Sequence, residues 1–415
     1  MKILLIHQYF KEADVTGGAR FNEMTRIWQE EGHEITVLAG DLDGQSVQKR
    51  AEYKGKFVTK KIQNGIEVWR CNVSESYNVN FLGRLWGYFS FVFSGLFAGL
   101  FKVKGKYDII LVTSPPLFVG IIAYVLSKAK GIPFVFEVRD LWPESAIDTG
   151  VLKNKAIIRF AYWFETFVYK KALLVNVLTP AFYNTLINFK NVPESKLIMI
   201  PNAADFALAD GLLDSFDREE FRKSMQFEGS FVITYVGAHG VANGLDQVLD
   251  TALLLRDTNV LFVLVGTGMQ KEKLLKRAKE QQIDNVKFFD PVPKKEVLKF
   301  ILASEMGASV LLKNDTFKTV YSNKTFDYMS CKTPILMAID GVSRELVEKA
   351  DAGMFVEPEN PEDFAAKVRY YMANPQEIRR QGENGFFYAK ANFDRDLLAK
   401  EYLKYLVQVT KQKHV

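Results

Sequence analysis

Short apolar runs of strand length alternate with longer amphipathic segments along the whole chain of 415 residues. In the first half the runs are KILLIHQ, HEITVLAG, GIEVWRC, DIILVTS, PFVFEV, LLVNVLT and KLIMIP. In the second half they are FVITYVG, VLFVLVG, VKFFD, GASVLL, PILMAI and GMFVEP. Continuous β-branched runs that are separated by helical periods predict parallel sheets covered by helices on both faces.

The alternation restarts near the middle of the chain, which predicts two domains. Residues 205–230 form a polar connection without a strand run, and a new series of apolar runs follows it. A chain of this length is also longer than one hydrophobic core usually supports. We therefore predict an α/β protein of two doubly wound, Rossmann-like domains of similar size, with a boundary near residue 205 and a cleft between them. Ligands of such sheets bind at the carboxyl ends of the strands.

Composition limits the class of protein further. Only Cys71 and Cys331 are present, so we expect no disulfide framework and favour a reducing compartment. The four histidines are scattered, and the sequence predicts no metal site. The start, MKILLIHQYF, predicts a first strand and no signal peptide. Residues 1–205 hold 25 Lys and Arg against 19 Asp and Glu. This surplus suggests an anionic surface nearby, either a membrane or a substrate phosphate, although a chance imbalance explains it equally.

Residues 81–101, FLGRLWGYFSFVFSGLFAGLF, are too aromatic for an ordinary surface helix. Their length would let a helix just span a bilayer. We rank a helix on a membrane surface first, a buried core helix second and a transmembrane helix third. Lys102, Lys104 and Lys106 follow the stretch and could meet anionic headgroups. A second aromatic stretch with a basic end is IIRFAYWFETFVYKK, residues 157–171.

Glycines follow several strand runs. Gly17 and Gly18 lie between the first strand and a helix, where the backbone can approach a ligand and the helix start can hold an anion. The spacing lacks the full Gly-x-Gly-x-x-Gly pattern, so we predict no dinucleotide site.

The second half repeats this arrangement at several crossings of its predicted sheet. YVGAHGVANGLD brings Ala238, His239 and Asn243 among glycines, and VGTG contributes Gly266 and Gly268. Only a sheet edge that is lined by a ligand needs close approach at successive crossings, so the recurrence predicts a binding site there.

The stretch FEVRDLWPES places charged residues directly after a strand of the first half. Asp140 could act as a base or bind hydroxyl groups, and Arg139 could offset the charge of a phosphate. Trp142 and Glu144 follow within the same turn. The alternative is an Arg-Asp pair that only orders a loop.

The stretch YSNKTFDYMSCKTP predicts a helix that Ser322 caps with its hydroxyl group. Asn323 and Lys324 then lie at the positive end of the helix dipole. A lysine there does not stabilise the helix, but it favours a phosphate. A plain surface helix is the alternative.

The motifs HQYF, GGAR, EEGHEITVLAG, TSPPL, EVRDLWPES, IPNAAD, VGAHGVANGLD, VGTG and SNKTFDYMSCKTPIL occur in this order along the chain. Together they resemble the family-4 retaining glycosyltransferases of the GT-B fold. The resemblance is strongest to the bacterial branch that builds surface polysaccharides, such as the colanic-acid and O-antigen fucosaminyl transferases. It implies an acceptor domain over residues 1–205, a nucleotide-sugar domain over 206–390, and a final helix over 391–415 that packs back on the first domain.

The resemblance also implies roles for single residues. Ser322, Asn323 and Lys324 would meet the diphosphate of the donor, and Asp327 would bind its ribose as the last acidic residue of a Glu-x7-Glu motif. Thr319 replaces the first glutamate of that motif. The family's basic pair is also missing, since Val241 and Asn243 stand near its expected place, so Lys313 or Arg139 would help to neutralise the diphosphate. The other expected donor-binding residues are Gly17, Gly18, Ala238, His239, Asn243, Gly266 and Gly268. The expected acceptor-binding residues are Arg20, Trp142 and Glu144, with Asp140 and Arg139 as catalytic candidates.

The activity implied is transfer of a sugar from a nucleotide-sugar, expected to be a UDP-sugar, with retention of configuration. We expect a lipid-linked saccharide as acceptor, at the cytoplasmic face of the plasma membrane. No metal or other cofactor and no nucleic-acid partner are expected. Two alternatives remain open at this point: a sugar-nucleotide epimerase of the same fold, and an inactive membrane scaffold of a polysaccharide complex.

Overall fold

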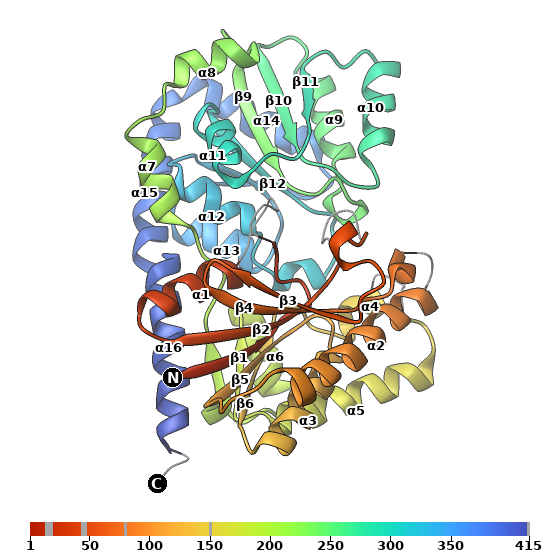
Figure 1. The fold of residues 1–415 in the computed structure, drawn as a ribbon. Coiled ribbons are helices and arrows are strands. Elements are labelled where there is room, and N and C mark those ends of the chain that lie inside the picture. Colours follow the sequence, from red (N-terminus) through yellow and green to blue (C-terminus); the bar gives the residue numbers. More distant parts are fainter. Residues whose placement is uncertain (13–19, 43–47, 79–80, 149–151, 413–415) are drawn as a thin grey trace. The chain divides into compact units, whose positions relative to one another are not determined.

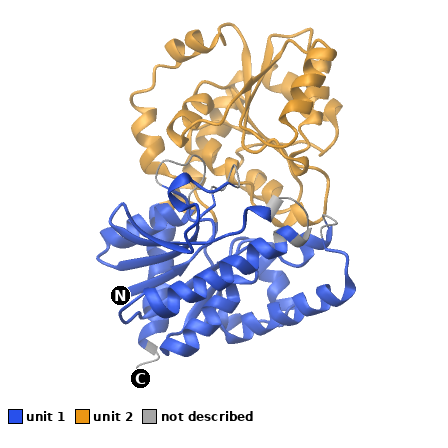
Figure 2. Cartoon of the chain, turned by 45° about the vertical axis from the view of Figure 1, so that its right-hand side comes forward, with its two compact units in different colours: residues 1–15, 19–201, 396–415 blue, residues 16–18, 202–395 orange. Residues whose placement is uncertain are grey.

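A computed structural model describes residues 1–12, 20–42, 48–78, 81–148 and 152–412 (Figure 1). The chain divides into two compact units (Figure 2). Residues 202–395 form unit 2, and the chain segments before and after them form unit 1. The predicted α/β fold of two doubly wound domains is confirmed. Each unit is described by itself.

Unit 1 is built on an eight-stranded sheet in the order β3-β4-β2-β1-β5-β6-β7-β8. Its strands are β1 (Lys2–Ile6), β2 (Glu34–Gly40), β3 (Val58–Gln63), β4 (Ile66–Cys71), β5 (Ile109–Ser114), β6 (Phe134–Val138), β7 (Leu174–Val177) and β8 (Leu197–Met199). Its helices are α1 (Arg20–Glu30), α2 (Phe81–Phe97), α3 (Val119–Lys130), α4 (Glu144–Asp148), α5 (Lys155–Lys171), α6 (Pro180–Asn188) and α16 (Arg395–Gln412), with short turns η1 (Ala51–Tyr53), η2 (Glu75–Asn78), η3 (Ala98–Lys102) and η4 (Glu194–Lys196).

The edge strand β3 is absent from the sequence-based prediction. It pairs with β4 in antiparallel orientation, whereas every other described pair of this sheet is parallel. Its sequence, VTKKIQ, is mostly polar, and Lys60 and Ile62 are exposed. A strand that is half solvated at a sheet edge lacks the continuous apolar run by which the buried parallel strands were recognised.

The C-terminal helix α16 contributes to unit 1 through α1. The indole N–H of Trp28 donates a hydrogen bond to the carbonyl of Ala399 (2.8 Å), and its ring lies edge-on to Tyr402. A buried Trp needs such a partner for its N–H, so this contact fixes the position of α16 against α1.

Helix α2 has one buried side and one exposed side. A Cβ atom on Gly95 or Gly99 would lie within 3 Å of Ile122 or Leu126, so these glycines let α2 approach α3 closely. The opposite side exposes Trp86 and other aromatic residues. Among the described residues, one helical stretch, Leu85–Lys102, is long and apolar enough to cross a membrane, and 44% of it is buried in the structure. By itself that is weak evidence for a membrane span.

Unit 2 carries a six-stranded parallel sheet in the order β11-β10-β9-β12-β13-β14. Its strands are β9 (Phe231–Val236), β10 (Val260–Val265), β11 (Val286–Phe289), β12 (Met306–Val310), β13 (Ile335–Ala338) and β14 (Gly353–Phe355). Its helices are α7 (Phe206–Leu213), α8 (Arg218–Met225), α9 (Asp246–Leu254), α10 (Lys271–Glu280), α11 (Lys294–Leu302), α12 (Asn323–Ser330), α13 (Val342–Lys349), α14 (Pro361–Ala373) and α15 (Pro375–Asn392), with turns η5 (Val241–Asn243) and η6 (Thr316–Thr319).

The chain direction across the unit 2 sheet reverses between β9 and β12, and in such sheets ligands bind at the carboxyl ends of the strands at this point. Tyr328 fixes α12 beside it. The ring of Tyr328 packs on Gly307, where a Cβ atom would lie only 2.5 Å away. Its hydroxyl lies 3.0 Å from the carbonyl of Thr234 and 2.9 Å from that of Ala308. These contacts hold α12 against β9 and β12.

Arg20, expected to bind the acceptor, is instead an interior residue of unit 1. Its guanidinium forms two 3.2 Å hydrogen bonds with the carboxylate of Glu137, and both side chains are almost fully buried. It also donates to the carbonyls of Ile200 (2.7 Å) and Pro201. The expectation is corrected because the strand β6 carries a carboxylate that takes up this charge.

We predict that Glu137→Ala lowers the free energy of unfolding of unit 1 by about 3–5 kcal/mol, because it leaves the charge of Arg20 buried without its partner. All five tryptophans precede residue 202, so tryptophan fluorescence during urea unfolding reports on unit 1. The control is Glu30→Ala, which breaks an exposed pair with Arg26 and should cost under about 0.5 kcal/mol. Equal losses in the two variants would contradict a structural role for the buried pair.

Candidate functional site

Gly237 follows β9, Gly266 follows β10, and their backbones are in close contact at the sheet edge of unit 2. Gly266 has φ +149°, and a Cβ atom there would lie 1.9 Å from the carbonyl oxygen of Gly237. A Cβ atom on Gly268 would lie 2.5 Å from the carbonyl of His239. Ala238, which follows Gly237, is exposed, and its carbonyl oxygen accepts a hydrogen bond from the hydroxyl of Tyr235 (2.8 Å). Side chains are excluded here, so a ligand at this edge would meet the backbone directly.

Helix α12 begins beside this edge, with Ser322 at the capping position. The prediction that its hydroxyl caps the helix is wrong. The hydroxyl instead accepts a hydrogen bond from that of Ser309 of β12 (2.8 Å). Its amide donates to the hydroxyl of Ser343 (3.1 Å). The N–H groups of Asn323 and Lys324 donate to no carbonyl of the described chain. The first turn therefore keeps two donors at the positive end of the helix dipole, as an anion site requires.

The side chain of Lys324 lies over the end of β9. Its Nζ is 4.8 Å from the centre of the Tyr235 ring, and its Cε packs against Gly237. No ion pair to this ammonium group is found within the described part of the chain. Burial lowers the pKa of Lys324 to about 8, and the charge of Asp327 opposes this only partly. An ammonium group in this state gains from an added anion, which would restore its pKa.

Asp327 lies one turn further along α12. Its carboxylate is bound to the ammonium group of Lys294 at the start of α11. The sequence-based prediction missed Lys294, because a lysine in the run PVPKKE has no distinctive spacing. The ribose contact predicted for Asp327 remains a prediction. In that contact the Asp327 carboxylate would accept hydrogen bonds from the ribose while it stays paired with Lys294.

Two side chains expected to bind the donor, those of His239 and Asn243, are instead buried or bonded within their own loop. The imidazole of His239 is fully buried, neither ring nitrogen has a hydrogen-bond partner, and burial with the charge of Lys271 lowers its pKa to about 4. It is neutral at pH 7 and faces no open surface. The side chain of Asn243 accepts the N–H of Gly240 (3.2 Å) and thereby closes its own turn.

Lys271, which the sequence-based prediction also missed, stabilises the ends of the strands beside His239. Its Nζ donates to the carbonyls of Gly266 (2.9 Å) and Phe289 (3.0 Å) and to the carboxylate of Asp290 (2.7 Å). One ammonium group thus joins the carboxyl ends of β10 and β11.

Lys313, expected to help neutralise the diphosphate, is paired with Glu357 (2.6 Å) on an exposed surface. Thr319, at the position of the family's first glutamate, donates its hydroxyl to the carbonyl of Thr316 (2.7 Å). Of the expected cations of unit 2, only Lys324 therefore combines burial with the absence of a described ionic partner.

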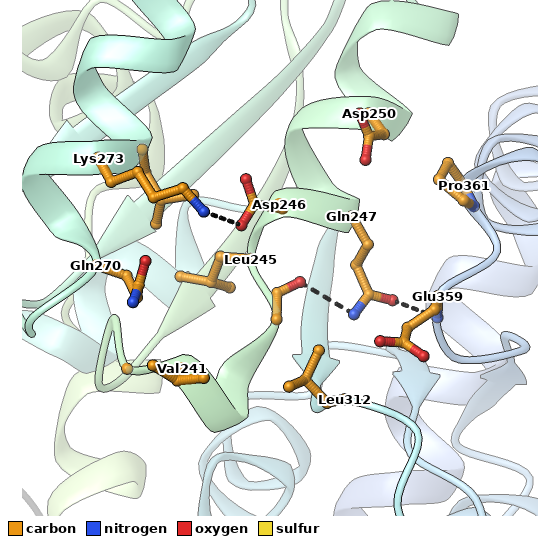
Figure 3. Close-up of a pocket in the computed structure, with 13 residues that line it drawn as sticks. Val241, Leu245, Asp246, Gln247, Asp250, Gln270, Lys273, Leu312, Glu359 and Pro361 are labelled. Carbon is orange, nitrogen blue, oxygen red and sulfur yellow. Dashed lines mark hydrogen bonds and ion pairs between the residues drawn. The ribbon is translucent and has the colours of Figure 1, made fainter.

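A pocket of about 430 Å³ lies next to this edge (Figure 3). Gln247 supports it by donating to the carbonyl of Gly244 (3.1 Å) and accepting the N–H of Glu359 (3.0 Å). Asp246, Asp250 and Glu359 line the pocket, with Lys273 as its one basic lining residue in the described chain. These carboxylates do not suit a diphosphate. The start of α12, which does not line this pocket, is the better anion site.

In unit 1 the expected residues after β6 lie in the turn and the short helix α4 that follow this strand. Burial raises the pKa of Asp140, and a hydrogen bond from the hydroxyl of Ser145 (2.7 Å) opposes the shift. Trp142 is half-buried, with its ring 5.6 Å from that of Phe118. Glu144 begins α4 and is bound to Lys190. Arg139 directly follows β6. The expected Gly17 and Gly18 lie outside the described residues.

No group of three or more His, Cys, Asp or Glu in the described ranges is arranged to hold a metal ion.

Comparison with protein families identifies both halves. Residues 16–203 match the family described as "Glycosyl transferase 4-like domain", and residues 217–386 match "Glycosyl transferases group 1". The curated relatives include the "Putative colanic acid biosynthesis glycosyl transferase WcaI" of Escherichia coli K12, which is 24% identical over 97% of this chain and 99% of its own length. "Probable glycosyltransferase WbjE" of Pseudomonas aeruginosa is 26% identical over 65% of this chain and 69% of its own.

Solved structures share the fold along the whole chain. Sucrose-phosphate synthase of Thermosynechococcus elongatus gives a TM-score of 0.74 at 14% identity, covering 99% of both chains. Anabaena Alr3699/HepE in complex with UDP gives 0.71 at 17% identity, covering 98% of this chain and 100% of its own. The chain is thus a glycosyltransferase of the GT-B fold, with a 4-like first half and a group 1 second half. The resemblance stated from the sequence is confirmed.

We predict that affinity for UDP falls as pH rises through about 8, because Lys324 loses its proton and with it the positive charge that attracts the diphosphate. Calorimetric titration between pH 7 and 10 measures this. Lys324→Met should weaken binding at pH 7 by roughly tenfold or more and flatten the profile, since a hydrogen bond to a charged group contributes about 1.5–3 kcal/mol. In Lys324→Arg the affinity should not change between pH 7 and 10, because the guanidinium group stays charged over this range.

The matched control for this titration is Lys349→Met, which removes an exposed lysine of α13 in the same unit. Its affinity and pH profile should equal those of the unchanged protein. A pH-independent affinity in the unchanged protein, or an equal loss in the control, would contradict the role of Lys324.

Proposed function

We propose that the protein transfers a sugar from a UDP-sugar, with retention of configuration, to a lipid-linked saccharide at the cytoplasmic face of the membrane. The reaction would serve the synthesis of a surface polysaccharide. The relative WcaI, named for colanic acid biosynthesis, supports the product class. The complexes of Alr3699/HepE with UDP and UDP-glucose support the donor class at the level of the shared fold.

The observation that carries the proposal is the ammonium group of Lys324 at the start of α12, without a carboxylate partner among the described residues. In the reaction, the bond between the anomeric carbon and the diphosphate oxygen breaks, and UDP leaves with the bonding electrons. Negative charge grows on the diphosphate, where the helix dipole, two backbone N–H groups and Lys324 stabilise it. We propose that these groups make a metal ion unnecessary.

The acceptor hydroxyl then bonds to the anomeric carbon, and its proton passes to the departing phosphate. No protein base is required for this step. We assign Asp140 and Arg139 to the orientation of the acceptor, because they follow β6 at the carboxyl edge of the unit 1 sheet. The raised pKa of Asp140 reflects its burial beside Ser145.

An exposed aromatic surface of unit 1 supports the membrane location. On α2 and η3 it consists of Trp86, Phe93, Phe97, Leu100 and Phe101, each between 38% and 66% exposed. On α5 it includes Phe160 and Trp163, 47% and 59% exposed. Helix α3 packs against both α2 and α5, and Figure 1 shows the three helices on the same side of the unit. The exposed lysines 102, 104 and 106 border α2 and suit anionic headgroups.

The donor is tested by incubating the protein with UDP-, GDP- and dTDP-sugars and analysing the products by chromatography. We expect slow release of free UDP from one UDP-sugar, since water can replace the acceptor, and at least a tenfold slower release by Lys324→Met. An isomerised nucleotide-sugar without free UDP would favour the epimerase alternative. Absence of binding to every nucleotide-sugar would favour the scaffold. Either result would overturn the proposal.

The membrane location is tested by flotation with vesicles of phosphatidylcholine with or without phosphatidylglycerol. The protein should float with the anionic vesicles. The variant Trp86→Ser/Phe93→Ser/Phe101→Ser should bind at least on the order of 100-fold less, since full burial of an aromatic side chain contributes about 1.5–3 kcal/mol and each of the three is more than half exposed. The control Met269→Ser/Phe387→Ser removes two exposed apolar residues of unit 2 and should float normally. Equal flotation of both variants would contradict the proposal.

A further inference from the structure

Unit 1 contains a cavity of about 610 Å³ between α5 and the connection from α6 to β8. This volume lies within the range of about 300–1,000 Å³ that is usual for small-molecule sites. Its lining includes Glu144 of α4, Tyr162 and Glu165 of α5, and Phe189 and Lys190 of the connection. No role is assigned to this cavity by the family comparisons or by the donor site in unit 2.

A chain of buried polar groups forms the inner wall. The hydroxyl of Tyr169 donates to Oε1 of Glu165 (3.0 Å), and Oε2 of Glu165 accepts from Nζ of Lys190 (2.7 Å). Lys190 is also bound to Glu144 and lies 4.6 Å from the centre of the Tyr162 ring. One ammonium group thus serves two carboxylates.

The cavity is lined by three lysines, at 170, 190 and 196, and by two glutamates, at 144 and 165. The side chain of Glu165 is only 1% exposed, and burial raises its pKa to about 7 although Lys190 opposes the shift. Buried carboxylates gain from further hydrogen-bond donors. Lys196 also lines the cavity, and its ammonium group donates to the carbonyls of Lys170 and Ala172 (3.0 Å each). A ligand that brought hydroxyl groups would supply further donors to the carboxylates.

Part of the lining is apolar. Phe189 is 78% exposed at the cavity, and Val192 and Pro193 follow it. Ring faces of aromatic residues carry partial negative charge and attract C–H groups. A ligand with both hydroxyl groups and apolar C–H faces fits this combination, and sugar rings have both.

We infer that this cavity is a saccharide subsite, in which Glu144 and Lys190 bind sugar hydroxyl groups and Phe189 packs on a ring face. The inference rests on the proposed function, because it assigns the bound sugars to the acceptor. Helix α4 provides the connection: Ser145 is bound to Asp140, the residue that orients the reacting hydroxyl, while the preceding Glu144 lines the cavity. A saccharide acceptor would thus extend from its reacting end at Asp140 over α4 into the cavity.

The test is saturation-transfer NMR of the full-length protein with the methyl glycosides of glucose, galactose and N-acetylglucosamine. At least one glycoside should receive saturation from the unchanged protein. In Phe189→Ser the signal should fall by about fivefold, the effect of losing one ring contact of roughly 1 kcal/mol. Because Phe189 is exposed, its replacement leaves the core intact. Phe387→Ser, which removes an exposed phenylalanine of α15, should leave the signal unchanged.

Methyl phosphate is tested in parallel. Binding of methyl phosphate with loss of the signal in Phe189→Ser, absence of any glycoside signal, or equal signals in both variants would overturn the inference. Release of UDP from the donor is measured on the same preparations. A failed saccharide subsite with intact UDP release is thereby distinguished from a failure of the proposed transferase function.

Discussion

The donor site that we propose for unit 2 depends on a single ammonium group at a helix start. Lys324 lies where the sheet order reverses, at the positive end of α12, and no described carboxylate is paired with it. The surrounding structure maintains this condition: Tyr328 anchors α12 on Gly307, and Lys294 takes up the charge of Asp327. An ammonium group without a described carboxylate partner suits the diphosphate that we propose as its ligand, and suits it most when the diphosphate gains charge on leaving.

The sequence predicted those features that repeat or follow a local rule. The buried parallel strands of both units were visible as apolar runs, and the glycines at 237, 266 and 268 were visible as breaks after them. The edge strand β3 was not, because a half-solvated strand has no continuous apolar run. Side-chain roles failed where a partner distant in sequence decides them. Glu137 lies 117 residues from Arg20, and nothing in either local sequence indicates the pair.

Buried charge has two different outcomes in unit 1. Arg20 and Glu137 form two hydrogen bonds with each other, and two further N–H groups of Arg20 donate to backbone carbonyls, which makes this pair structural. Lys190 instead serves two carboxylates at the wall of an open cavity. The first arrangement has no need of a ligand, whereas the second gains from one. The partners of each charge thus separate a core contact from a candidate site.

The central claim is that the start of α12 holds the diphosphate, and a crystal structure of the protein with UDP tests it most directly. The account predicts a phosphate oxygen within hydrogen-bond distance of Nζ of Lys324 and of the N–H groups of Asn323 and Lys324, with the backbone of Gly237 alongside. A diphosphate bound elsewhere, in the acidic pocket beside Gln247 or against unit 1 alone, with Lys324 left without an anion, would contradict it.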